Sequence, residues 1–126
     1  MICNFILYVR DQQASTRFYQ NVLAQEPKLN VPGMTEFQLS NESVLGLMPE
    51  KGIKRLLGEA IEDPEATNGI SRAEIYLTVL APEKFMERAI AAGGRLLSKI
   101  ENRNWGDKAG YVADLDGHVI AFASRI

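Results

Sequence analysis

Two stretches of the chain repeat one pattern of apolar and polar positions. Residues 2–9 and 74–79 each read as a β-strand, because side chains of one kind recur at every second position. In the first stretch, Phe5, Leu7 and Val9 share one face. A helical pattern and further apolar strands follow each of the two stretches. The chain is therefore predicted to contain a duplicated unit of strand, helix and strands.

The predicted helices have recognisable starts and ends. In the first unit either Asp11 or Ser15 can cap a helix that runs to about Leu23. In the second unit Pro82 suits the first turn of a helix, and the glycine pair at 93–94 ends it. We expect each helix to cover the apolar face of its own strands, including Phe5, Leu7 and Val9.

Further short strands complete each unit. They are expected at residues 34–39, 44–48, 96–100, 110–113 and 118–124, with 101–108 as a loop and a turn at Asp114–Gly117. Residues 1–50 then form the first unit, 51–70 a polar linker with a short helix at 53–60, and 71–126 the second unit. The length of 126 residues fits a single domain, so 1–126 is predicted to be one domain of the α+β class.

Composition narrows the range of partners. The net charge of -2 gives no field that would attract nucleic acid or an anionic membrane. No apolar run approaches the roughly 20 residues that span a bilayer, and no signal peptide is recognisable. The single cysteine, Cys3, excludes an intrachain disulfide and suits a reducing compartment, so we expect a cytoplasmic protein. Because Cys3 falls in a strand, we expect it to be buried.

The second face of the predicted strands has the composition of a ligand site. Small residues at Gly46 and Ala121 are expected to leave space there. The neighbouring positions carry polar, aromatic and flexible side chains, namely Asn4, Ile6, Tyr8, Met48, Glu74 and Tyr76. This mixture favours an organic ligand over a hydrated cation.

Two aromatic residues outside these strands complete the candidate set. Trp105 lies in a predicted loop, where a packing anchor is favoured over a stacking platform, and Tyr111 can reach either face of its strand. His118 is expected to be structural or exposed and not a catalytic base. A nucleophile–base pair would have to join Cys3 to His118, the only residues of their kinds, from strand starts in different units.

An ordered set of motifs resembles the vicinal oxygen chelate superfamily, which includes glyoxalase I, extradiol dioxygenases, fosfomycin resistance enzymes and bleomycin resistance proteins. The motifs are Asp11-x6-Phe18-Tyr19 after the first strand, Trp105-Gly106, and Gly110-Tyr-Val-Ala-Asp-Leu-Asp-Gly-His118. The resemblance covers essentially the whole chain. It implies two tandem βαβββ units whose curved sheets enclose a ligand cavity, often in a homodimer.

The resemblance also implies where metal-dependent members would hold a divalent ion. Matched through the motifs, these positions are Asn4, Gly46, Glu74 and Ala121. Gly46 and Ala121 have no side-chain donor, and a zinc site with His or Cys ligands is not available. We therefore expect neither a metal nor another cofactor.

The sequence leaves three functions open. We favour a protein of the bleomycin resistance type that binds a small aromatic or amphipathic molecule without catalysis, in the manner of antibiotic sequestration. The alternative is a metal-dependent glyoxalase-like lyase or isomerase, or a dioxygenase-related enzyme, that uses Glu74. The third is an interaction protein whose cavity accommodates a partner. The two units can pair within one chain or exchange between two chains, because both arrangements bury the same faces.

Overall fold

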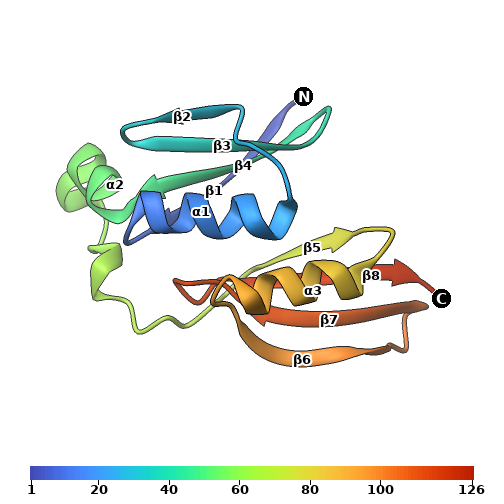
Figure 1. Ribbon diagram of the computed structural model, residues 1–126. Coiled ribbons are helices and arrows are strands. Elements are labelled where there is room, and N and C mark those ends of the chain that lie inside the picture. The colour runs from blue at the N-terminus through green and yellow to red at the C-terminus, as the bar shows by residue number, and fades with distance from the viewer. The chain divides into compact units, whose positions relative to one another are not determined.

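Each half of the chain folds into a four-stranded sheet with one helix. The computed structural model describes residues 1–126 (Figure 1). The first unit contains β1 (Cys3–Val9), α1 (Gln12–Leu23), β2 (Leu29–Val31), β3 (Met34–Ser40) and β4 (Ser43–Pro49). The second contains β5 (Glu74–Thr78), α3 (Pro82–Ala91), β6 (Arg95–Asn102), β7 (Asp107–Ala113) and β8 (Val119–Arg125). Between them lie α2 (Glu50–Leu57) and the short 3-10 helices η1 (Gly58–Ala60) and η2 (Pro64–Ala66).

The two sheets have the same topology. The strand order is β1-β4-β3-β2 in the first sheet and β5-β8-β7-β6 in the second. In both sheets the opening strand runs parallel to the closing strand, and the other neighbours are antiparallel. The predicted α+β class with two βαβββ units is therefore confirmed.

The structure adds regular elements that the hydrophobic pattern does not predict. Strand β2 has only three residues, all of them exposed, so no alternation marks it. Strands β6 and β7 extend into the region predicted as a loop and leave only residues 103–106 between them. Helix α2 begins at Glu50, within the first predicted unit, because the chain turns into the helix directly after β4. Whether the chain forms one domain with the predicted boundaries stays a prediction.

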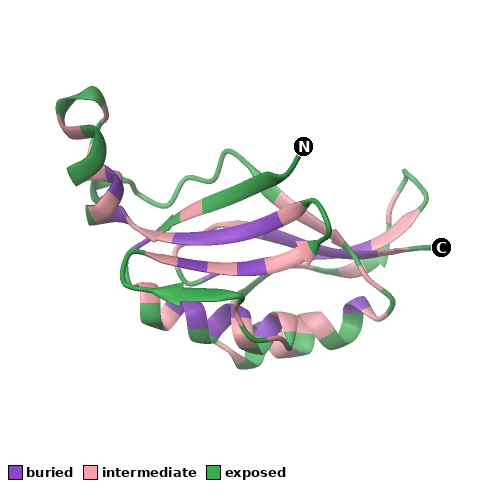
Figure 2. Cartoon of the chain, turned by 90° about the horizontal axis from the view of Figure 1, so that it is seen from above, coloured by how far each residue is buried: buried purple, intermediate pink, exposed green.

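In the first unit, contacts between α1 and β3 hold the helix against the sheet. Asp11 is the N-cap of α1, and its side chain accepts a hydrogen bond of 2.9 Å from the backbone N–H of Ala14. The ring of the buried Tyr19 lies 6.5 Å from that of Phe37 in β3. Buried residues run along the inner strands and along one side of the helices (Figure 2). The spacing of apolar residues in α1 thus places its aromatic side on the sheet.

The second unit packs α3 against β7 and β8. The rings of Phe85 in α3 and Phe122 in β8 are 5.6 Å apart, and Phe122 is fully buried. Close approach of the chain after α3 depends on Gly94, which donates a backbone hydrogen bond of 2.8 Å to Ala89. A Cβ atom at Gly94 would lie 2.8 Å from the carbonyl oxygen of Ala89 and 2.9 Å from Cγ2 of Val112. Glycine is therefore required at this position.

The substitution Gly94→Ala is expected to lower the free energy of unfolding by about 1–3 kcal/mol, because the backbone oxygen of Ala89 cannot move aside cheaply. Gly52 is the matched control, since it lies inside α2 and an added Cβ would make an ordinary contact of 3.6 Å with Met48. Gly52→Ala should leave stability unchanged or raise it slightly. Urea denaturation followed by circular dichroism measures both changes, and equal midpoints would contradict the expected difference.

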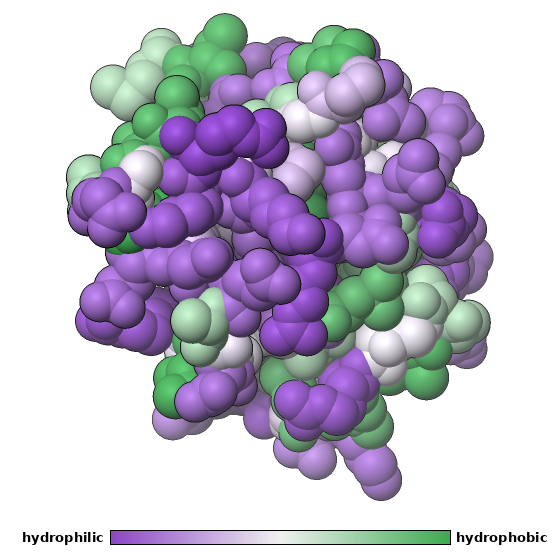
Figure 3. Space-filling model, turned by 90° about the vertical axis from the view of Figure 1, so that its left-hand side faces the viewer, coloured by the Kyte–Doolittle hydropathy of each residue, from purple (hydrophilic) through white to green (hydrophobic).

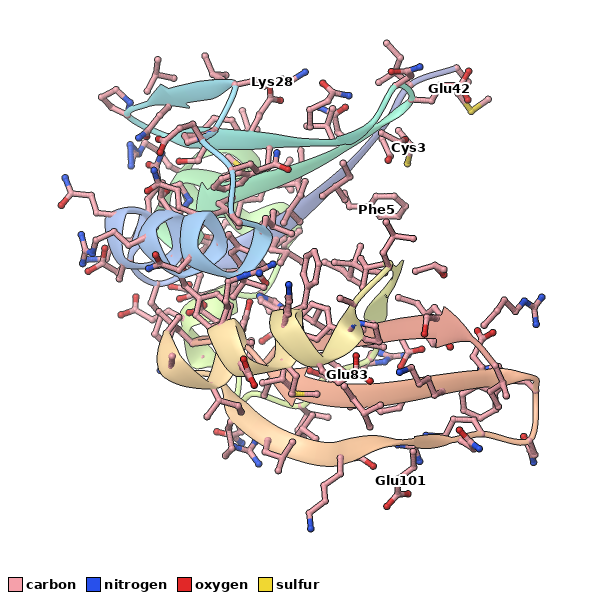
Figure 4. The ribbon with its side chains drawn as sticks, turned by 45° about the vertical axis from the view of Figure 1, so that its right-hand side comes forward. Cys3, Phe5, Lys28, Glu42, Glu83 and Glu101 are labelled. Carbon is pink, nitrogen blue, oxygen red and sulfur yellow. The ribbon has the colours of Figure 1, made fainter.

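The start of β1 differs from the prediction. Phe5 is 52% exposed and Cys3 is also exposed, so the expectation that both are buried was wrong. Figure 4 shows the Phe5 side chain projecting away from the β1 ribbon. The reason is position: β1 is the edge strand of its sheet, and on the face of Phe5 the residues become more buried toward Val9, which is fully buried. Alternation alone does not distinguish the covered end of a strand from its uncovered end.

Candidate functional site

One face of the second sheet gathers several candidate residues predicted from the sequence. Tyr76 in β5, Ala121 in β8 and Tyr111 in β7 are direct neighbours across the three strands. Side chains that are paired in this way point to the same face. Ala121 is fully buried, while the two tyrosines are half-buried. The space predicted above Ala121 is therefore filled locally.

Trp105 joins this face through a hydrogen bond. Its indole Nε1–H donates to the hydroxyl oxygen of Tyr76 at 3.0 Å, and the Tyr76 hydroxyl donates to Oδ2 of Asp107 at 2.9 Å. Asp107 also forms a salt bridge of 3.4 Å with Arg125. Trp105 stays 50% exposed, so it is not a buried packing anchor. We call Tyr76, Trp105 and Tyr111 the aromatic cluster.

The surroundings of Tyr76 raise the pKa of its phenol, mainly through burial. Partial burial raises the pKa of the Tyr76 phenol, the hydrogen bond from Trp105 opposes that rise, and the Asp107 carboxylate adds to it. The phenol is therefore neutral at physiological pH and can act as the donor to Asp107. Because it gives one hydrogen bond and accepts one, its ring is held in place by both partners.

This pKa shift gives the hydrogen bond between Tyr76 and Asp107 a defined pH dependence. Because the pKa of Tyr76 is higher in the folded than in the unfolded state, the protonated phenol contributes its full stabilisation at pH values below the ordinary tyrosine pKa of about 10. This contribution is lost as the pH rises through the higher folded-state pKa. Tyrosinate absorbance of the wild type, compared with Tyr76→Phe, should show one phenol that ionises at a higher pH than in a model peptide. Asp107→Asn should move that ionisation to lower pH. An unshifted ionisation in the wild type would contradict the assignment.

Tyr111 rests against an arginine that the sequence pattern does not reveal. The guanidinium carbon of Arg103 lies 5.4 Å from the centroid of the Tyr111 ring. The guanidinium donates hydrogen bonds to the carbonyl oxygens of Ala109 and Lys99 and to the hydroxyl of Ser98, at 2.8–3.0 Å. Arg103 therefore connects β6 to β7 and supports the Tyr111 ring from the side of β6.

The candidate residues of the first unit are arranged differently. The Asn4 side-chain amide donates to Oε2 of Glu36 at 3.1 Å, so the amide is engaged. Gly46 pairs with Ile6, and a Cβ at Gly46 would lie 3.1 Å from Cγ1 of Ile6 and 3.3 Å from the Met34 sulfur. The space predicted at Gly46 is thus occupied by these two side chains.

The remaining candidate residues are all at least partly exposed. Tyr8 and Met48 are paired neighbours on β1 and β4, and both are at least partly exposed. Glu74 is exposed at the start of β5, two residues before Tyr76 on the same face. His118 is half-buried, and its backbone N–H donates to the Asp114 carboxylate at 2.8 Å within the turn before β8. That the His118 side chain is structural or exposed, and not a catalytic base, stays a prediction.

Comparison with models of known protein families shows which family the chain belongs to. The model of the family described as glyoxalase-like domain matches residues 2–126. The chain therefore belongs to the glyoxalase-like domain family, within the vicinal oxygen chelate superfamily. A search of curated proteins gives no match.

Solved structures share the fold. A glyoxalase-related enzyme from Fulvimarina pelagi is 28% identical, with a TM-score of 0.82 over 99% of this chain and 88% of its own. A glyoxalase/bleomycin resistance protein/dioxygenase family enzyme from Burkholderia phytofirmans is 17% identical, with a TM-score of 0.81 over 98% of this chain and 97% of its own. Protein ATC0852 from Agrobacterium tumefaciens is 23% identical, with a TM-score of 0.74 over 100% and 98%.

The donor atoms of this chain do not fit the divalent ion of metal-dependent relatives. Of the four corresponding positions, Gly46 and Ala121 offer no side-chain donor, and the Asn4 amide is hydrogen-bonded to Glu36. Glu74 is the only carboxylate among them. No group of three or more His, Cys, Asp or Glu side chains in residues 1–126 is arranged to hold a metal ion. A hard divalent cation needs more oxygen ligands than these positions supply.

Proposed function

We propose that the protein binds a small aromatic or amphipathic molecule on the aromatic cluster, without a metal. The observation that carries this proposal is the hydrogen-bonded chain from Trp105 through Tyr76 to Asp107, next to Tyr111 on the same sheet face. Rings that are already held in place lose little conformational entropy when a ligand stacks on them. Family membership supports a ligand-binding role on this fold, while the residues themselves suggest the ligand.

The chemistry of the cluster supports an aromatic ligand over a strongly polar one. The hydroxyl of Tyr76 and the indole N–H of Trp105 are paired with each other, so the cluster presents mainly ring surface. Aromatic rings prefer offset or edge contacts with other rings, and these contacts add to the hydrophobic contribution. The exposed carboxylate of Glu74, on the same face, can add a polar contact.

Sequestration of an antibiotic is the biological role that we propose for this binding. Solved structures of the same fold carry the name bleomycin resistance protein, and sequestration needs affinity without catalysis. We also propose a cytoplasmic location, since the exposed thiol of Cys3 suits a reducing compartment. The structure contains no helix that is long and apolar enough to cross a membrane.

Titration of Trp105 fluorescence tests the proposal directly, because Trp105 is the only tryptophan of the chain. We expect saturable quenching or a spectral shift with at least one of three probes: bleomycin, ciprofloxacin and 8-anilinonaphthalene-1-sulfonate. Calorimetry with the same probes should give matching affinities. No saturable signal from any probe by either method would contradict the proposal.

Metal analysis separates this proposal from an enzyme that uses Glu74. Protein purified without chelator is expected to contain less than stoichiometric Mn, Ni, Fe or Zn, because two of the four family positions lack donors. Stoichiometric metal that is lost in Glu74→Gln would favour a glyoxalase-like lyase. A Glu74→Gln variant with unchanged probe affinity would remove Glu74 from the ligand site.

A homodimer is the assembly that we propose. Strand β1 is a sheet edge on which Phe5, Ile6 and Tyr8 are all exposed. Apolar residues exposed on such an edge are usually buried against another protein chain. Light scattering coupled to size-exclusion chromatography should give twice the chain mass of 14.0 kDa. Phe5→Lys combined with Ile6→Lys should yield a monomer, whereas a monomeric wild type would contradict the proposal.

A further inference from the structure

A concave region lies in the first unit, between α1 and the β2–β3 hairpin. It has a volume of about 510 Å³, which is within the range of small-molecule sites. Its lining residues come from one side of α1 and from the hairpin: Gln12, Gln13, Thr16, Arg17, Gln20, Asn30, Val31, Pro32 and Gly33. We call this region the α1 groove. The start of α1 and the hairpin turn lie at the left in Figure 1, and the surface seen from that side is mainly hydrophilic (Figure 3).

The wall of the α1 groove is held rigidly by Gln12. Its side-chain amide donates to the carbonyl oxygen of Val31 at 2.8 Å and to the Thr35 hydroxyl at 3.0 Å. Its side-chain oxygen accepts from the backbone N–H of Gly33 at 2.9 Å. The hydroxyls of Thr16 and Thr35 are 2.8 Å apart beneath it. These bonds fix the distance between helix and hairpin before any ligand arrives.

Two of the groups that remain available in the α1 groove are hydrogen-bond donors, one on Asn30 and one on Arg17. Asn30 uses its side-chain oxygen to accept from Thr35, which leaves its NH₂ group available. Arg17 is exposed and forms none of the salt bridges of the chain. Arg17 is also the only charged residue of the lining, so the lining carries a single positive charge.

Two carboxylates stand close to the α1 groove in sequence, but neither lines it. Asp11 accepts a hydrogen bond from the N–H of Ala14 as the cap of α1. Glu26 accepts a hydrogen bond of 2.7 Å from the side-chain amide of Gln20. The Glu26 carboxylate thus contacts a lining residue, but neither carboxylate forms a salt bridge with Arg17. On the hairpin side, Val31 and Pro32 provide a short apolar wall.

From these observations we infer that the α1 groove binds a small carboxylate that has a short aliphatic chain and a further oxygen acceptor. The carboxylate would lie against the Arg17 guanidinium, which suits planar two-oxygen groups. The second oxygen would accept from the NH₂ of Asn30, and the aliphatic carbons would contact Val31. The groove belongs to the first unit and shares no residue with the aromatic cluster, so the inference is independent of the proposed function.

The test uses levulinate, which has a carboxylate, a ketone oxygen and a short aliphatic chain, and its neutral amide, levulinamide. The side-chain NH₂ signals of Gln12, Gln13, Gln20 and Asn30 report on the groove in nitrogen–proton correlation spectra of the intact protein. We expect levulinate, titrated to tens of millimolar, to shift these signals in a saturable manner. Levulinamide should produce much smaller shifts, because the contact with Arg17 depends on charge.

Two substitutions and one control sharpen the result. Arg17→Gln should weaken levulinate binding by about tenfold or more, the effect of losing a charge-assisted hydrogen bond. Asn30→Asp keeps the acceptor for Thr35 but adds a negative charge, and it should abolish binding. Arg95→Gln, an exposed arginine of β6 outside the groove, should leave binding unchanged. Absent shifts with levulinate, equal shifts with levulinamide, or unchanged binding by Arg17→Gln would each overturn the inference.

Discussion

Tyr76→Ala is expected to weaken the binding of an aromatic ligand by about thirtyfold or more, the usual effect of truncating an aromatic anchor in a binding site. The substitution removes one ring of the aromatic cluster and also the hydrogen-bond acceptor of Trp105. Trp105, already half exposed, would lose the contact that fixes its indole. Calorimetric titration with whichever probe gives the strongest fluorescence response measures the loss.

Tyr76→Phe separates the two contributions of this residue. It keeps the ring but removes the hydrogen bonds to Trp105 and Asp107, so we expect a loss of only a few-fold. Leu56→Ala is the control, because Leu56 is an exposed apolar residue of α2, outside the aromatic cluster and the proposed dimer edge. Circular dichroism confirms that each variant is folded. Wild-type affinity in Tyr76→Ala would show that ligand binds elsewhere.

The fold could be predicted from the sequence because its main signals are local. Alternation in β1 and β5, the helix cap at Asp11 and the glycine pair after α3 each specify the structure of a few residues. Repetition of the same order of elements predicted a duplicated unit, and the resemblance to the vicinal oxygen chelate superfamily implied its βαβββ topology. The three-residue strand β2 was missed because it forms only by pairing with β3, and its own residues carry no pattern.

The candidate site could be predicted only in part, because hydrogen bonding between strands does not follow periodicity. Tyr76 and Ala121 share a face as expected, whereas the face of Tyr111 was left open by the sequence and is given by the pairing of β7 with β8. Asp107 and Arg103 were missed because they lay in a region read as a loop, and only the pairing of β6 with β7 gives them their partners.

The empty volume predicted at Gly46 fails for a related reason. A small residue indicates space only if its neighbours do not fill that space, and the sequence does not show how Ile6 and Met34 lie. A Cβ atom at Gly46 would force these two side chains to shift by a few tenths of an ångström. Glycine at this position is thus explained by packing within the first sheet.

The largest expected effect on stability is that of Phe122→Ala, which should lower the free energy of unfolding by about 3–5 kcal/mol. Phe122 is fully buried, its ring contacts that of Phe85 in α3, and it sits next to Ala121 in β8. Removing the ring leaves a cavity between α3 and the sheet that the backbone of the central strand β8 cannot close. Trp105 fluorescence during urea denaturation follows this unit, because Trp105 lies between β6 and β7.

Two further variants show whether this loss arises from the cavity. Phe122→Leu retains most of the buried volume and should cost much less than the alanine substitution. Leu115→Ala truncates a residue that is 42% exposed in the turn before β8, and it should change stability by less than about 1 kcal/mol. If the three midpoints coincide, Phe122 does not anchor α3 on the sheet. If only Phe122→Ala lowers the urea midpoint, the contact between α3 and β8 stabilises this strand. The same strand carries Ala121, which lies between Tyr76 and Tyr111 on the other face, so the aromatic cluster depends on that contact.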